Sequence, residues 1–420
     1  MTIDLHELGR RLREARNACG LSQEVVANQL GISRTSLTQI ENGNRNVGGL
    51  ELDQLARLYG RAIQDFLQPD FSADQGFQAF FRLNPEFATN EERFALQNCI
   101  ALAREITALE RLLDIEVELG TSYELGSPRS RGEAIVHGNR VAEEERRRLS
   151  LGDAPIMNLR ELLETEGVRT AALVLPLNVS GLTLFGADLG RFVAVQKHDV
   201  PLRQRFSLAH EYAHVVMDSR GPGRVSRKRE EDNIEIRANA FAAAFLLPEI
   251  GVRDLVASLG SASHLRAATA QVFNGDEGAV AASRDGRSGY NIGLLAATHV
   301  AQHYGVSRLA AIYRMHNIGL FGRDQLDKLV ADERAGKGSR LARVLGLSED
   351  SEDQRLVAST QRLQLLGIEA VRRDLISRRK FIELLELAGM SLDDAEEFVY
   401  EACEDPSEEI NGIQFDETPF

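Results

Sequence analysis

Three residues suited to metal chemistry stand close together in RFSLAHEYAHVVMD, residues 205–218: His210, Glu211 and His214, in the order H-E-x-x-H. Side chains four positions apart in a helix lie on one face, so both imidazoles can reach one metal ion. The glutamate can hold a metal-bound water and take up its proton. The pattern predicts a hydrolytic metal site. The alternative is a core helix that carries two histidines.

A third ligand is available in NIEIRANAFAAAFLLPE, residues 233–249. Catalytic zinc uses three protein ligands and leaves one position for water. Glu235 and Asn239 are four apart and share a helix face, so Glu235 can be the third ligand. Asn239 can then bond the outer nitrogen of a ligand histidine. We therefore expect Zn²⁺ as cofactor.

A second histidine pair tests this interpretation. His299 and His303 in HVAQH are also four apart, but Val300 occupies the position that would need a glutamate. With no base and no carboxylate partner in that segment, we expect both histidines to be ordinary surface or core residues.

The composition limits the class of protein. The chain has 420 residues, of which 43% are apolar and 27% are charged, which is typical of a globular protein of two or three domains. Cys19, Cys99 and Cys403 are an odd number without CxxC spacing, so neither a disulfide framework nor a thiolate zinc site is indicated. No apolar run approaches the roughly 18 residues of a membrane span, and the first residues are polar. We expect a cytoplasmic protein without membrane contact.

The net charge of −14 is unevenly distributed. Residues 1–68 hold eight arginines and eight acidic residues, so this segment is neutral and the excess of acid lies downstream. Four of the arginines fall within residues 10–16, where they could present a basic face to phosphate.

The first 66 residues divide into short helical segments that glycines separate. Ser22 and Ser33 stand at the positions of N-caps, and two helices of about ten residues are joined across LGIS. This is the pattern of a helix-turn-helix, in which the second helix enters the major groove. A helical protein-interaction domain without a DNA target is the alternative.

The segment LSQEVVANQLGISRTSLTQIENGNR resembles the lambda-repressor-like, XRE-type helix-turn-helix family over about the first 65 residues. A proline that this family usually has after the G-x-R turn is missing, since the chain continues NRNVGGLEL. The resemblance implies that double-stranded DNA is a partner and that the DNA contacts are Gln23, Ser33, Arg34, Thr35, Ser36, Gln39, Asn44 and Arg45.

The pair FSLAHEYAH and ExxAN-x-FAAxxLLP resembles the ImmA/IrrE family of metallopeptidases over about residues 130–250. This resemblance implies that His210, His214 and Glu235 are zinc ligands and that Glu211 is the general base. It also implies cleavage of helix-turn-helix repressors in stress responses or in the regulation of phages and mobile elements.

The elements around these motifs predict an α+β fold that is mainly α. Strands are expected at 170–177, at 191–196 and in the GLTLFGADLG segment between them, so that a small sheet precedes the H-E-x-x-H helix as in zincins. Residues 219–232 are expected to form a polar loop between the two motifs. HYGVSRLAAIYRMHNIG resembles a second helix-turn-helix, for which we favour a structural role.

Five segments are predicted. They are a helix-turn-helix domain at 1–68, a helical connector at 69–129, a zinc peptidase core at 130–255, a helical region at 256–400 and an acidic tail at 401–420. We expect a homodimeric DNA-binding regulator whose peptidase domain cleaves a repressor or the chain itself. The alternative is a transcription factor whose metal domain senses a ligand or is structural.

Overall fold

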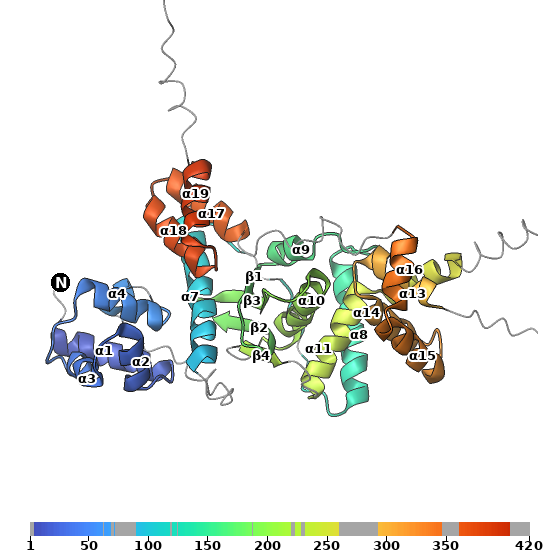
Figure 1. Ribbon diagram of the computed structural model, residues 1–420, viewed down its shortest axis with the longest axis horizontal. Helices are drawn as coiled ribbons and strands as arrows, with labels where there is room; N and C mark the ends of the chain where they lie inside the picture. Colours follow the sequence, from blue (N-terminus) through green and yellow to red (C-terminus); the bar gives the residue numbers. More distant parts are fainter. Residues whose placement is uncertain are drawn as a thin grey trace, which may run out of the picture.

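The computed structural model describes residues 4–61, 63–68, 71, 90–117, 120–123, 125–186, 188–219, 223–227, 232–259, 293–346 and 361–403. The chain is mainly helical with one small sheet, which confirms the predicted fold class (Figure 1). Most of the predicted acidic tail lies outside the described residues. No helix in the described ranges is long and apolar enough to cross a membrane.

The N-terminal domain consists of short helices: α1 (Leu5–Ala18), α2 (Gln23–Leu30), α3 (Arg34–Glu41), α4 (Gly49–Leu58) and α5 (Ile63–Leu67). The Ser22 side chain caps α2 by accepting a hydrogen bond from the Val25 amide, and Ser33 caps α3 in the same way. The turn between α2 and α3 contains Gly31 at a φ of 67°, a conformation that glycine adopts without steric cost. The predicted helix-turn-helix is therefore present as α2 and α3.

The predicted basic face at residues 10–16 is wrong. Arg10 pairs with glutamates of its own helix, and Arg13 donates to the Glu41 carbonyl. Arg16 is buried and bonds both oxygens of the buried Glu41 carboxylate, at 2.5 and 3.1 Å. Arg11 donates to the Phe66 carbonyl. Arg11, Arg13 and Arg16 thus link α1 to other parts of the domain, a role that the local density of arginine cannot distinguish from phosphate binding.

Helix α7 (Asn90–Leu112) stands between the N-terminal helices and the sheet (Figure 1). Arg104 donates to the Gly60 carbonyl after α4 at 2.7 Å and to the Asp188 carboxylate beside the sheet at 2.8 Å. Leu102 and Ile106 of α7 lie in one continuous hydrophobic core with residues of the N-terminal domain and of the sheet. The segment predicted as a connector thus contributes a core helix. The same core includes α17 (Gln361–Arg372), α18 (Arg378–Leu387) and α19 (Leu392–Cys403).

The sheet has the order β1-β3-β2-β4, with β1 parallel to β3 and the other neighbours antiparallel. Its strands are β1 (Val168–Leu173), β2 (Val179–Gly186), β3 (Gly190–Gln196) and β4 (Gly223–Arg227). Three strands were predicted, whereas β4 falls in the segment predicted to be a loop. GRVSR has one large apolar residue, Val225, so it lacks the alternation that indicates a strand.

Helices α9 (Leu159–Thr165) and α10 (Pro201–Met217) cover the other face of the sheet in a second hydrophobic core. Farther from the sheet lie α8 (Arg131–Arg148), α11 (Asn233–Leu246), α13 (Leu294–Tyr304), α14 (Arg308–Asn317), α15 (Arg323–Arg334) and α16 (Lys337–Val344) (Figure 1). Val193 and Val195 of β3 face this second core, while Phe192 and Ala194 face the core of α7. The helix-turn-helix-like pair α13 and α14 is part of the second core.

Candidate metal centre

Two buried helices carry the predicted metal-binding residues. Helix α10 begins with Pro201, and every residue from Ser207 to Met217 is buried. Helix α11 packs against it and is capped by Asp232, whose carboxylate accepts from the amides of Ile234 and Glu235, both at 2.8 Å. The cap fixes the first turn of α11, and this turn carries Glu235.

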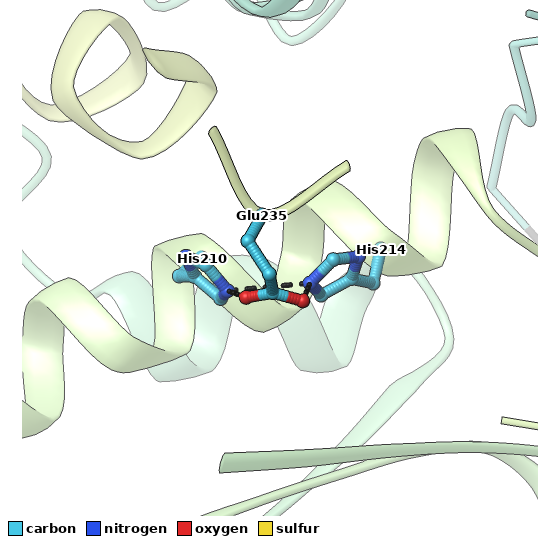
Figure 2. Close-up of side chains that lie close together, drawn as sticks. All are labelled: His210, His214 and Glu235. Carbon is cyan, nitrogen blue, oxygen red and sulfur yellow. Dashed lines mark hydrogen bonds and ion pairs between the residues drawn. The ribbon is translucent and has the colours of Figure 1, made fainter. Parts of the chain in front are cut away.

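His210, His214 and Glu235 turn their side chains toward one another (Figure 2). The two Nε2 atoms lie 3.2 Å apart, Nε2 of His210 lies 3.0 Å from Oε2 of Glu235, and Nε2 of His214 lies 3.4 Å from Oε1. Among the described residues, these form the one group of three histidine, cysteine or acidic side chains that could hold a metal ion. The structure thus brings together the residues predicted as ligands, and their role as ligands stays a prediction.

The outer nitrogen of each imidazole faces an oxygen. Nδ1 of His210 lies 3.1 Å from Oδ1 of Asn239, and Nδ1 of His214 lies 2.8 Å from Oδ2 of Asp218. When Nδ1–H donates to these acceptors, Nε2 keeps its lone pair and faces the centre. Arg237 in turn donates to Oδ1 of Asp218. Asp218 was not among the residues predicted from the sequence, although its position four residues after His214, at the C-cap of α10, was a usable signal.

Electrostatics favour a charged carboxylate at the centre. Burial raises the pKa of Glu235, but hydrogen bonds from His210 and His214 outweigh it and hold this pKa far below its usual range. Burial lowers the pKa of His214, while hydrogen bonds to Asp218 and Glu235 raise it more, to about 10. A cation that takes the Nε2 lone pair of His214 therefore competes with a proton.

Glu211 is fully buried and points toward strand β2. Its Oε2 accepts a hydrogen bond of 2.6 Å from the Thr183 hydroxyl, while Oε1 is buried and has no partner within the described residues. A Cβ added at Gly181 would lie 2.2 Å from this Oε1, so the carboxylate occupies space that a side chain at position 181 would fill. An unpaired buried carboxylate oxygen is costly to fold and is suited to receive a proton from a water molecule.

The donor set fits zinc. A tetrahedral zinc ion with ligand bonds of about 2.0–2.1 Å separates its ligand atoms by about 3.3–3.4 Å. The three separations in this centre are 3.0, 3.2 and 3.4 Å. Two neutral imidazoles and one carboxylate are also a ligand set of catalytic zinc. A metal site is therefore available, and Glu211, the residue after His210 on the same helix, has one carboxylate oxygen without a partner among the described residues.

The predicted DNA contacts gather around α3. Arg34, Thr35 and Gln39 are exposed on this helix, and Asn44 is exposed beyond it. The remaining four also have partners within the domain. The Ser33 hydroxyl caps α3 and lies 2.9 Å from that of Ser36, Gln23 donates to Glu41 at 2.8 Å, and Arg45 pairs with Glu51 at 2.7 Å.

The second histidine pair forms no comparable centre. His299 and His303 lie on α13, where His303 is exposed and its ring contacts the ring of Tyr304 at a centroid distance of 4.7 Å. Neither belongs to a group of potential ligands among the described residues.

Comparisons with known families agree with this architecture. Residues 7–65 match the family model of a helix-turn-helix domain, and residues 165–316 match that of a peptidase family described as the IrrE N-terminal-like domain. No curated protein and no solved structure matches the chain significantly. The chain thus combines a DNA-binding helix-turn-helix domain with a metallopeptidase-like domain, and the predicted fusion is confirmed.

Proposed function

We propose that this protein is a DNA-binding transcriptional regulator whose second domain is a zinc-dependent endopeptidase. The observation that carries the proposal is the cluster of three donor atoms at zinc-like separations on the two buried helices α10 and α11. The neighbouring buried carboxylate of Glu211, with one unpaired oxygen, supports hydrolysis rather than metal storage.

His210, His214 and Glu235 would hold the ion, and Asn239 and Asp218 would orient the two imidazoles. Bound zinc would supply Lewis acidity and lower the pKa of a water molecule. Glu211 would accept a proton from water and later give it to the leaving nitrogen. Thr183 holds the other oxygen of Glu211 in place at 2.6 Å.

The substrate we propose is a protein, either a helix-turn-helix repressor or the chain itself. Cleavage would change gene expression in a stress response or in the regulation of phages and mobile elements. The DNA target is a double-stranded operator that α3 reads in the major groove, and we propose that a homodimer reads two half-sites.

The domain limits we propose follow the two hydrophobic cores. Helices α13 and α14 share their core with α10 and α11, and the peptidase-family match extends to residue 316. We therefore extend the peptidase domain past residue 255 and treat α17–α19 as a separate helical unit on α7.

The ligand assignment is tested by metal analysis. Purified wild-type protein is expected to contain about one zinc per chain, and His210→Ala should lose it because one of three protein ligands is gone. His303→Ala serves as the matched control, since this exposed histidine lies outside the centre. Full zinc occupancy in His210→Ala would contradict the assignment.

Asp218→Asn is expected to weaken zinc binding by about 10–100-fold, because the carboxylate that orients His214 loses its charge. Competition with a chromogenic chelator measures the affinity. Asp188→Asn is the control, since Asp188 is half exposed and pairs with Arg104 of α7. Equal zinc affinity in the two variants would show that Asp218 does not support the metal.

Arg34→Ala is expected to cost about 1–3 kcal/mol of binding to a fragment of the chain's own promoter, because an arginine at the start of α3 can bond a guanine edge in bidentate fashion. Electrophoretic mobility shift at fixed salt measures it. Arg10→Ala is the control, because Arg10 is equally a surface arginine but pairs with Glu7 and Glu14 on α1. If Arg34→Ala keeps wild-type affinity, α3 is not the reading helix.

A second function has one observation in its favour. The DNA-binding domain and the sheet of the peptidase-like domain share a core through α7, as a sensor that controls its own DNA reader would require. In that case the metal domain senses a ligand or is structural, and substitution of Glu211 would leave target regulation unchanged.

A further inference from the structure

Arg224 of β4 reaches the metal centre from the edge of the sheet. Its Nε donates to Oε1 of Glu235 at 2.6 Å, and Nη2 donates to Oδ2 of Asp232 at 2.5 Å. Asp232 is the N-cap of α11 and Glu235 lies in its first turn. Arg224 therefore ties the edge strand to the part of α11 that carries the third predicted ligand.

These two hydrogen bonds fix the orientation of the guanidinium and leave some of its N–H donors available. The group has a third nitrogen, Nη1, with two more N–H donors, and the side chain is 23% exposed. A positive charge held in advance beside a reaction centre stabilises developing negative charge without reorganisation. Arg224 thus has the position and the chemistry of an electrophilic residue.

Other polar groups in the described part of the centre are engaged elsewhere. Asn239 faces His210, and Thr183 donates to Glu211. Arg237 donates to Asp218 and its side chain is only 2% exposed. Among the described residues that contact the three predicted ligands, Arg224 is the cation, and its side chain is partly exposed.

We propose that Arg224 is a catalytic residue that binds the carbonyl oxygen of the scissile peptide bond, an inference that rests on the proposed function. Glu211 takes a proton from water while the water oxygen bonds to the carbonyl carbon, and the π electron pair moves onto the carbonyl oxygen. The Arg224 guanidinium donates to that oxygen as it becomes negative. The electron pair on oxygen then re-forms the C=O bond as the C–N bond breaks, the C–N pair stays on nitrogen, and this nitrogen takes the proton from Glu211. The products are a carboxyl group and an amine.

The test compares Arg224→Met, Arg224→Lys and Arg227→Met as zinc-loaded full-length proteins. Arg227 lies on the same strand, but the alternation of side chains puts it on the opposite face, which makes it the matched control. Four quantities are measured: kcat and KM on a cleaved repressor, zinc affinity by chelator competition, and the Kd of a phosphinic peptide that copies the cleaved bond.

Arg224→Met is expected to lower kcat by about 10²–10³-fold with KM within about threefold of wild type. The Kd of the phosphinic peptide should rise by a similar factor, with zinc stoichiometry unchanged at saturating metal. Arg224→Lys keeps the charge and should fall between Met and wild type, and Arg227→Met should behave as wild type. The lysine variant keeps the test valid if loss of the β4–α11 contact unfolds the methionine variant.

Two results would overturn the assignment of Arg224 alone. The first is an unchanged phosphinic-peptide Kd in Arg224→Met. The second is a loss of activity that excess zinc restores, because Arg224 would then act only on Glu235. A wild-type protein that takes up zinc but neither cleaves repressors nor binds the phosphinic peptide would overturn the proposed function as well.

Discussion

Glu211→Gln is expected to retain zinc and to lose peptide cleavage by about 10²–10⁴-fold. The amide can neither accept the proton of the attacking water nor return it to the leaving nitrogen. Because Glu211 is fully buried and one of its oxygens is unpaired, removal of its charge should leave the unfolding midpoint unchanged or raise it. Loss of activity without loss of stability is the signature of a group kept for chemistry.

The measurements are single-turnover cleavage of a repressor, zinc content and thermal unfolding of the same samples. Glu249→Gln is the control, because Glu249 is a half-exposed residue that pairs with Arg253. Wild-type cleavage by Glu211→Gln would remove Glu211 from the mechanism. A fall in stability would show instead that the buried carboxylate serves the fold.

Glu110→Ala is expected to destabilise the protein by about 3–5 kcal/mol. Glu110 of α7 is buried and bonds Arg169 of β1 through Oε2 and Arg362 of α17 through Oε1, the latter at 2.6 Å. Arg169 is itself buried, so loss of the carboxylate leaves an uncompensated charge in the core. This one glutamate joins the helix beside the DNA-binding domain, the sheet and the C-terminal helices.

Urea unfolding measures the effect, and α7 offers a matched control. Glu105→Ala removes an ion pair with Lys380 whose side chains are 23% and 40% exposed, so its expected cost is below about 1 kcal/mol. Equal costs for the two variants would mean that Glu110 contributes no more than a surface pair and that α7 is not held to the sheet through this residue.

Local patterns were sufficient for much of the fold. Ser22 and Ser33 indicate where α2 and α3 begin. The side-chain oxygen of each serine accepts a hydrogen bond from a helix amide that has no partner within the helix. The helical spacing of His210 and His214 follows from the geometry of one helix. Glu235 and Asn239 could be proposed because their helix, α11, was also evident from its apolar residues.

Contacts between segments that are distant in the chain could not be predicted from the sequence. Strand β4 is short and polar, and its pairing with β2 defines it more than its own residues do. Arg224 could not be assigned to Glu235 without knowing that β4 lies beside α11. Arg13 and Arg16 of α1 were misread because their partner Glu41 lies on another helix, α3. Tertiary neighbours decide whether a charged residue faces solvent or holds the core.

Incubation with candidate substrates tests the proposed peptidase activity most directly. Zinc-loaded protein is mixed with helix-turn-helix repressors encoded near its own gene, and products are identified by mass spectrometry. We expect one repressor, or the chain itself, to be cut at a defined peptide bond, with cutting abolished by a chelator and in Glu211→Gln. If the repressors and the chain itself stay intact while one zinc is bound per chain, the proposed peptidase activity is contradicted.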